Sequence, residues 1–289
     1  MDARLAAELG TALRSPVVVS RPLSGGDIND AFEVKLDDGR RLFVKTNVRA
    51  SGEMFPTEAQ GLAWLGEARA LRVPEVVAVS SGYGGTVPFL ALEMIATGAP
   101  ARDFDERLGQ GLAALHRFGA PSFGLDHDNF VGRLPQANSP LEPWAEFYRA
   151  RRLGPQLKQA ADAGLASPRM RRGFERLFAT LEDLVGPPEP PSRLHGDLWG
   201  GNLLCDDKGA PCLIDPAVYG GHREIDLAMM RLFGGFAGRV FDAYEEAWPL
   251  AEGKKERVAL YQLYPLMVHV NLFGGGYVGS VESALERLT

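Results

Sequence analysis

The stretch of sequence that decides the fold is residues 193–216, RLHGDLWGGNLLCDDKGAPCLIDP. The segment before it, residues 186–191, contains four prolines. Because a proline-dense segment cannot continue a helix, it delivers the chain to this stretch in an extended form. Asp197 then follows a His-Gly pair, Asn202 comes five residues later, and Asp215 ends an apolar run. The stretch therefore predicts a polar loop, followed by two short strands around a turn.

These three polar side chains meet the chemical requirements of phosphoryl transfer. A transferred γ-phosphoryl group needs Mg²⁺ to neutralise its charge, and Mg²⁺ prefers oxygen ligands such as those of Asn202 and Asp215. The acceptor hydroxyl needs a base, for which Asp197 is the candidate. The spacing predicts Asp197 as the catalytic residue and Asn202 and Asp215 as metal ligands, with ATP and Mg²⁺ as cofactors.

The first part of the chain is rich in strand signals. A strand near 17–19 leads to the glycine-rich turn at 24–26, and residues 31–36 and 42–45 form a hairpin around Asp38-Gly39. If those two residues alone make the turn, one face of the hairpin carries Phe32, Val34, Phe43 and Lys45. An ammonium group at the edge of an apolar surface suits the binding of a ligand that combines a flat ring with a charged tail.

Further elements follow in a strand-rich and then a helix-rich order. Pro56 and a capping-box pattern at 57–60 predict a helix that continues toward Leu71. Strands are expected at 75–79 and 89–95. Apolar residues at helical spacing then predict three helices, at 103–115, 144–157 and 169–185.

Length and composition describe an ordinary globular protein. The chain has 289 residues, a formal net charge of −6 and 45% hydrophobic residues, which fits one large domain or two lobes. The acidic balance argues against nucleic-acid binding, which needs a basic surface. The sequence lacks an apolar run of about 18 residues or more and begins without a signal-peptide pattern. We therefore expect a cytoplasmic monomer with no nucleic-acid or membrane partner.

Two cysteines, Cys205 and Cys212, flank the predicted turn at 206–209. A disulfide between them is conceivable. Two thiols on neighbouring strands are the favoured interpretation in a reducing compartment.

The His195-Gly196-Asp197 motif, with Asn202 and Ile214-Asp215, resembles the motif of the aminoglycoside phosphotransferase branch of the protein kinase-like fold. That resemblance implies an α+β, two-lobed fold. It divides the chain into a sheet-rich N-lobe at 1–95, which binds the nucleotide phosphates, and a mostly helical C-lobe at 96–289, which holds the catalytic loop, the metal and the substrate pocket. The hinge is expected near 92–98.

The same resemblance assigns an ATP site in the N-lobe. Lys45 is similar to the lysine that grips the phosphates, and Glu58 to the glutamate that pairs with it. Glu58 could instead be a first-turn carboxylate favoured by the helix dipole alone. The remaining expected ATP-binding residues are Gly25 and Gly26 in the glycine loop and, through the backbone of the hinge, Glu93, Met94 and Ile95.

A narrower resemblance covers nearly the whole chain. Residues 195–202, HGDLWGGN, and 215–229, DPAVYGGHREIDLAM, are similar to the fructosamine kinase (ketosamine-3-kinase) family. The resemblance implies ATP-dependent phosphorylation of the 3-hydroxyl on the sugar part of a small-molecule or protein-bound ketosamine. The phosphorylated product sheds its sugar, which repairs the glycated amine. The resemblance also implies that Trp199 packs against the sugar and that His269 reaches the substrate pocket.

Several assignments have a structural alternative. His195 and Asp226 are expected to support the catalytic loop rather than to transfer protons. Trp199 could roof the core, and His269 could form a satisfied core pair with Asn271. Asp27, in the glycine loop, could either repel phosphates or fold back onto backbone N–H groups.

Two other functions compete with ketosamine phosphorylation. A choline, homoserine or aminoglycoside kinase would keep the same catalytic residues, because specificity lies in the C-lobe pocket. A non-catalytic kinase-like binding module is disfavoured, because Lys45, Asp197, Asn202 and Asp215 are all present.

Overall fold

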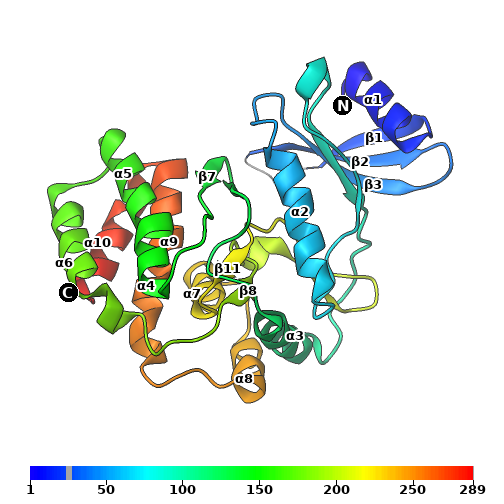
Figure 1. The fold of residues 1–289 in the computed structure, drawn as a ribbon. Coiled ribbons are helices and arrows are strands. Elements are labelled where there is room, and N and C mark those ends of the chain that lie inside the picture. The colour runs from blue at the N-terminus through cyan, green and yellow to red at the C-terminus, as the bar shows by residue number, and fades with distance from the viewer. Residues whose placement is uncertain (24–27, 289) are drawn as a thin grey trace. The chain divides into compact units, whose positions relative to one another are not determined.

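The structure is a computed structural model that describes residues 1–23 and 28–288 (Figure 1). By their contacts the residues form two compact units. The first unit comprises Met1–Phe104 and Leu204–Asp215, and the second comprises Asp105–Leu203 and Pro216–Thr289. This division differs from the predicted boundary after residue 95, because the first unit continues to Phe104 and takes in a segment from much later in the chain.

The first unit is built on a five-stranded antiparallel sheet in the order β1-β2-β3-β5-β4. Its strands are β1 (Val17–Leu23), β2 (Asp30–Leu36), β3 (Arg41–Thr46), β4 (Val76–Ser80) and β5 (Phe89–Glu93). Its helices are α1 (Ala3–Leu13), α2 (Met54–Glu67) and the short 3₁₀ turn η1 (Tyr83–Gly85).

Two hydrophobic clusters cover opposite faces of this sheet. Successive side chains of a strand point to opposite faces, so Phe89 of β5 belongs to one cluster and Leu90 to the other. Helix α1 packs Leu5 and its i+4 neighbours on the first face, and α2 packs Leu62 on the second. Each large apolar side chain buried in this way contributes roughly 1.5–3 kcal/mol.

The β2–β3 hairpin is present, but its register corrects the predicted one. The N–H of Leu36 donates to the carbonyl of Arg40 (2.9 Å), so three residues rather than two form the loop. Gly39, the last of them, has φ 89°, the left-handed conformation that such three-residue loops require. Phe32 therefore pairs with Val44 rather than with Lys45.

The extra loop residue changes which side chains share a face. The apolar face of the hairpin carries Phe32, Val34, Leu36, Leu42 and Val44. Lys45 lies on the other face with Phe43. The predicted grouping of Phe32 and Val34 with Phe43 and Lys45 was wrong, because a one-residue slip exchanges the two faces of a strand.

Helix α2 begins and ends earlier than predicted. It starts at Met54, so Pro56 lies in the first turn, where no intrahelical partner is lost. Thr57 is inside the helix, and its hydroxyl donates to the carbonyl of Glu53 (2.8 Å). The predicted capping box is therefore not formed, and the helix ends at Glu67.

The late segment of the first unit is a hairpin of β9 (Leu203–Cys205) and β10 (Pro211–Leu213). The carboxylate of Asp206 closes its turn by accepting from the N–H groups of Lys208 (3.0 Å) and Ala210 (2.8 Å). Cys205 and Cys212 are free thiols, in agreement with the favoured interpretation. Burial raises the pKa of Cys212 to about 12, so this thiol stays protonated.

The second unit is mostly helical. Its helices are α3 (Phe104–Phe118), α4 (Trp144–Phe147), the π-helical turn η2 (Tyr148–Leu153), α5 (Gly154–Asp162), α6 (Pro168–Leu184), α7 (Glu224–Phe233), α8 (Gly238–Ala247), α9 (Lys254–Phe273), the 3₁₀ turn η4 (Gly275–Tyr277) and α10 (Val278–Glu286). Its short strands are β6 (Asn129–Val131), β7 (Leu134–Gln136), β8 (Ser192–Leu194) and β11 (Tyr219–Gly221), and η3 (Gly200–Asn202) is a 3₁₀ turn. Helix α9 packs against α5, α7 and α10 (Figure 1).

The observed elements confirm an α+β protein with a sheet-rich N-terminal part and a helical C-terminal part. The three predicted C-terminal helices are present, the middle one as α4, η2 and α5 in succession. Within residues 1–23 and 28–288, no helix combines the length and the apolar character that a membrane span needs.

Candidate active site

Lys45, Glu58 and Asp215 form an ionic cluster in the first unit, in which Lys45 is buried and Asp215 is partly exposed. The Lys45 ammonium donates to Glu58 Oε1 of α2 (2.8 Å) and to Asp215 Oδ1 (2.6 Å). Only 5% of Lys45 is exposed. Burial alone would lower the pKa of Lys45, but attraction to the two carboxylates outweighs burial and raises it above its usual value. The ammonium is therefore charged, and the predicted Lys45–Glu58 ion pair is present.

The backbone of Asp215 is unusual. Its φ is 55°, a left-handed conformation that residues other than glycine rarely adopt. The residue comes two positions after β10, so the hairpin sets where its carboxylate is presented. Strained conformations of this kind persist where the surroundings enforce them, and they concentrate at functional sites.

The predicted hinge residues lie at the end of β5. Glu93 is the last residue of that strand, and its N–H donates to the carbonyl of Glu75 (2.8 Å). Met94 is half-buried and Ile95 is buried. The predicted glycine-loop residues Gly25, Gly26 and Asp27 lie outside the described residues.

Asp197 and Asn202 lie together in the loop that follows β8 in the second unit. The Asn202 amide Nδ2 donates to both the carbonyl oxygen of Asp197 (2.8 Å) and its carboxylate Oδ2 (3.1 Å). These bonds hold the Asp197 carboxylate in one orientation. Because a metal ion binds an amide through oxygen, use of Nδ2 in this way is compatible with metal binding by Oδ1.

Asp226 holds the same loop from the first turn of α7. Its fully buried carboxylate accepts from the N–H groups of His195 (2.8 Å) and Gly196 (2.9 Å), and from His116 Nε2 (3.1 Å). Burial would raise the pKa of Asp226, but the hydrogen bond and charge of His116 outweigh it and lower the pKa. The predicted supporting contact from Asp226 to the loop is therefore present.

The backbone before Asp197 leaves no room for a side chain. Gly196 has φ 80°, and a Cβ there would fall 2.0 Å from the carbonyl oxygen of Ala217. Fully buried His195 accepts from the N–H of Asp197 through Nδ1 (3.3 Å). His195 thus supports the loop, as predicted.

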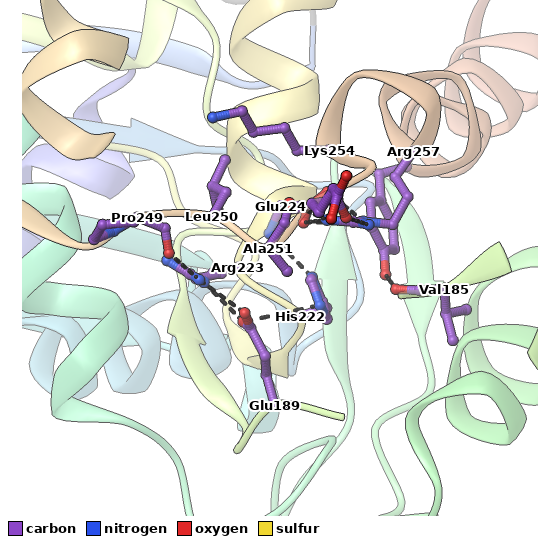
Figure 2. A network of polar contacts seen from close by, with 12 residues as sticks. Val185, Glu189, His222, Arg223, Glu224, Pro249, Leu250, Ala251, Lys254 and Arg257 are labelled. Carbon is purple, nitrogen blue, oxygen red and sulfur yellow. Dashed lines mark hydrogen bonds and ion pairs between the residues drawn. The ribbon is translucent and has the colours of Figure 1, made fainter. Parts of the chain in front are cut away.

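A buried ion-pair network anchors the proline-rich segment that leads into β8 (Figure 2). Arg223 donates two hydrogen bonds of 2.7 Å to the carboxylate of Glu189, and one of 2.9 Å to the carbonyl of Pro249. Beside this pair, Arg257 donates to the Glu224 carboxylate. Burial would raise the pKa of Glu189, but the Arg223 hydrogen bonds outweigh it and lower the pKa. The network fixes the extended entry to the catalytic loop.

Trp199 and His269 lie on separate elements of the second unit. Trp199 is 42% exposed, and Gly201 lies against its ring, since a Cβ at Gly201 would fall 2.3 Å from Cη2. The exposed ring does not roof the core. Whether it stacks on a sugar stays a prediction.

His269 lies on α9 among aromatic rings. Its ring stacks on Phe233 with centroids 4.3 Å apart and contacts Phe273 and Tyr277. Its Nδ1 lies 2.8 Å from the carbonyl of Pro265 and donates to it. Burial lowers the pKa of His269. Asn271 instead donates to the Gln156 side chain (2.7 Å), so the alternative of a His269–Asn271 pair is not what the structure shows.

Sequence analysis missed several residues of this site. His116 occupies the apolar face of α3, next to Leu112 and Leu115, and a polar side chain on such a face signals a buried partner. Glu189 and Arg223 carried no such signal, because their pairing joins segments 34 positions apart. Arg72, which binds the β9–β10 hairpin, carried none either.

Comparisons with known proteins identify the relatives of this chain. The family model described as fructosamine kinase matches residues 1–289. A probable ketoamine kinase of Lactiplantibacillus plantarum is 40% identical over 268 residues, which cover 92% of this chain and 93% of that protein. The chloroplastic protein-ribulosamine 3-kinase of Arabidopsis thaliana is 37% identical and covers 91% of this chain and 80% of its own length.

Comparison with solved structures leads to the same family. A candidate fructosamine-3-kinase from Thermobifida fusca superimposes with a TM-score of 0.88 at 41% identity, over 98% of this chain and 97% of that one. An aminoglycoside phosphotransferase superimposes with a TM-score of 0.63 at 16% identity, over 98% of each chain. The second likeness concerns the fold alone, and it confirms the protein kinase-like fold.

Proposed function

Since the chain belongs to the fructosamine kinase family, we propose that it transfers the γ-phosphoryl group of ATP to the 3-hydroxyl on the sugar part of a ketosamine. The observation that carries this function is the family match across residues 1–289. The enzyme is thus a phosphotransferase with an alcohol group as acceptor. Fructosyl and ribulosyl amines, free or protein-bound, are the proposed substrates, and deglycation of the amine is the proposed outcome.

Asp197 is the proposed catalytic base. It accepts the proton of the 3-hydroxyl as that oxygen attacks the γ-phosphorus and the bond to the β-phosphate oxygen breaks. Its hydrogen bonds from Asn202 Nδ2 support this role, because they fix the carboxylate before the substrate arrives. His195 and Asp226 act as positioning residues for the loop that carries it.

The proposed nucleotide-binding residues belong to the first unit. Lys45, held by Glu58, orients the phosphates, and its retained charge supports this role. Gly25 and Gly26 are proposed to let backbone N–H groups approach the phosphates. The backbone of residues 93–95 is proposed to meet adenine.

Asn202 and Asp215 are the proposed ligands of Mg²⁺. An amide oxygen and a carboxylate are the oxygen donors that Mg²⁺ prefers. When bound, Mg²⁺ neutralises charge on the phosphate oxygens.

Trp199 and His269 are the proposed sugar-side residues. The 42% exposure of Trp199 supports stacking on a sugar face. The Nδ1 hydrogen bond of His269 to Pro265 leaves Nε2 as an acceptor in the neutral ring, which suits a substrate hydroxyl. We further propose a cytoplasmic monomer, in keeping with its two free thiols.

The test is ATP consumption by the purified protein with Mg²⁺, comparing fructosyl-lysine and ribulosyl-lysine with lysine, choline and kanamycin. Turnover is expected with the two ketosamines only. Turnover confined to choline or kanamycin would show that the proposed acceptor is wrong. No ATP consumption with any compound would favour a binding module.

Asp197→Ala is the variant that tests the mechanism. We expect turnover to fall by about 10²–10⁴-fold, the range for a lost general base, with the Kd for MgATP unchanged. Asp126→Ala, which removes a carboxylate that is 90% exposed, is the matched control. Wild-type turnover in Asp197→Ala would contradict the proposed base.

A further inference from the structure

Arg72 joins three parts of the first unit. Its guanidinium Nη1 donates to Asp206 Oδ2 in the turn between β9 and β10 (2.8 Å), and Nη2 donates to Glu93 Oε1 at the end of β5. Its carbonyl accepts from the N–H of Leu213 (2.8 Å), the last residue of β10. One residue therefore binds both the proposed adenine hinge and the hairpin that ends two residues before Asp215.

The carboxylates on the two sides of Arg72 are themselves fixed. Asp206 is only 4% exposed at its side chain. Its backbone bonds from Ala210 and Lys208 occupy Oδ1, which leaves Oδ2 for Arg72. The other Glu93 carboxylate oxygen accepts from the N–H of Glu75 (3.3 Å). Arg72 thus connects two rigid anchors.

The planar guanidinium explains why arginine stands here. It offers separate N–H groups in fixed directions, so it can bind two carboxylates at once, whereas a lysine ammonium is a point charge on a flexible stem. A residue needed only for surface charge would not require two such partners.

We propose that Arg72 is a positioning residue for the nucleotide: it ties the hinge to the hairpin of Asp215, so that the adenine end and the metal-binding end of the site keep a fixed spacing. This inference rests on the proposed function, which supplies the reason for holding the two ends of the site at a fixed spacing. The contacts of Arg72 with the hinge and the hairpin can be tested without any acceptor substrate. Arg72 does not touch the reacting atoms in this proposal.

The first experiment measures hydrogen exchange of backbone amides in the full-length protein. In Arg72→Gln, exchange in peptides covering residues 93–98 and 203–215 is expected to rise about tenfold or more. Arg41→Gln is the matched control, because Arg41 lies on β3 of the same unit and also pairs with a carboxylate, that of Glu33 (2.6 Å). Unchanged exchange in both peptides would contradict the proposal that Arg72 holds the hinge and the hairpin together.

The second experiment measures the Kd for MgATP by calorimetry. We expect Arg72→Gln to weaken binding about tenfold, Arg72→Lys to weaken it less, and Arg41→Gln to leave it unchanged. A general loss of folded protein would lower the number of binding sites instead, with Kd unaltered, and that result would overturn the positioning role.

Asp206→Asn separates the hairpin arm from the hinge arm. The asparagine Oδ1 can still accept from Lys208 and Ala210, while the atom facing Arg72 is no longer an acceptor. Combined with Arg72→Gln, it should add little to the Kd change, because both remove the same contact. Additive effects would overturn the proposal. A wild-type protein that binds MgATP but phosphorylates no ketosamine would refute the proposed acceptor alone.

Discussion

Gly196 allows the backbone path that brings Asp197 to its position in the loop. Its left-handed backbone and the close carbonyl of Ala217 both demand a residue without Cβ. The N–H of Ala217 also donates to the carbonyl of His195 (2.9 Å), so the residue before Gly196 is bound to the same neighbour. A side chain here would have to displace the hydrogen-bonded backbone of Ala217.

Gly196→Ala is therefore expected to lower turnover at least tenfold and to destabilise the fold. Gly164→Ala is the matched control, because Gly164 has φ 71° but no neighbouring atom within 4 Å of the place that an alanine methyl group would take. That control isolates the cost of the left-handed backbone, about 1–2 kcal/mol. Steady-state kinetics and urea unfolding measure the two effects. Equal behaviour of both variants would show that the contact with Ala217 is unimportant.

At the scale of elements, the path into the catalytic loop depends on a buried network rather than on regular structure. Residues 186–191 contain four prolines and form no helix or strand. Their position is set by Glu189, which Arg223 holds from the start of α7 (Figure 2). His222, 3% exposed, lies beside them with Nε2 3.9 Å from Glu189. The network therefore contains a neutral imidazole next to paired charges.

His222 predicts a dependence of stability on pH. Burial lowers its pKa to about 4 from about 6.5. Between those values the unfolded chain binds the proton and the folded chain does not, so acidification favours unfolding. We expect this residue alone to reduce the free energy of unfolding by about 3 kcal/mol between pH 6.5 and pH 4. Above pH 6.5 the effect should fade over about one pH unit, because the imidazole of the unfolded chain then loses its proton as well.

Urea unfolding of the wild type and of His222→Gln across that window measures the effect. The stability of the variant should change less steeply between pH 4 and pH 6.5, and the two curves should become parallel above that range. Identical slopes in both proteins would mean that His222 is protonated in the folded state as readily as in the unfolded chain.

The sequence predicts candidate site residues from the chemistry that phosphoryl transfer demands. Asp197, Asn202 and Asp215 were identified from residue type and spacing. The Lys45–Glu58 pair was expected from the resemblance to the kinase-like family, and the structure confirms that contact. Asp197 and Asn202 could be grouped from the sequence because they lie five residues apart, and the structure confirms their contact.

Register and long-range partners could not be predicted in the same way. Nothing local distinguishes a two-residue from a three-residue loop at Asp38-Gly39, yet that single residue decides which face carries Lys45. The partners of Arg72 lie far away in the sequence, and so does His116, the partner of Asp226 that the sequence did not indicate. Only the folded chain selects them.

At the scale of the whole molecule, the chain passes between the two units three times. The segment Leu204–Asp215 joins the first unit although its neighbours on both sides belong to the second. Proposed nucleotide ligands thus come from both ends of the first unit's sequence, Lys45 early and Asp215 late. Binding of MgATP should therefore stabilise the folded chain as a whole.

We expect MgATP at about 100 times its Kd to stabilise the protein by about 2.7 kcal/mol, which corresponds to a rise in Tm of about 4–5 °C for a chain of this size. Chelation of Mg²⁺ with EDTA should remove most of the rise. Asp215→Ala should show little rise even with Mg²⁺ present. Thermal unfolding followed by circular dichroism gives the measurement, and an undiminished shift in Asp215→Ala would argue against that residue as a metal ligand.

The late position of residues 204–215 in the sequence also affects folding of the first unit during translation. At about 5–20 residues per second, a ribosome needs about 6 to 22 s to add the 111 residues from Asp105 to Asp215. During that interval the strands of the N-terminal sheet have been synthesised, but the hairpin that binds Arg72 has not. The N-terminal unit is therefore completed only after most of the chain has been synthesised, and a nascent chain that stalls before Asp215 leaves it open to chaperones and proteases.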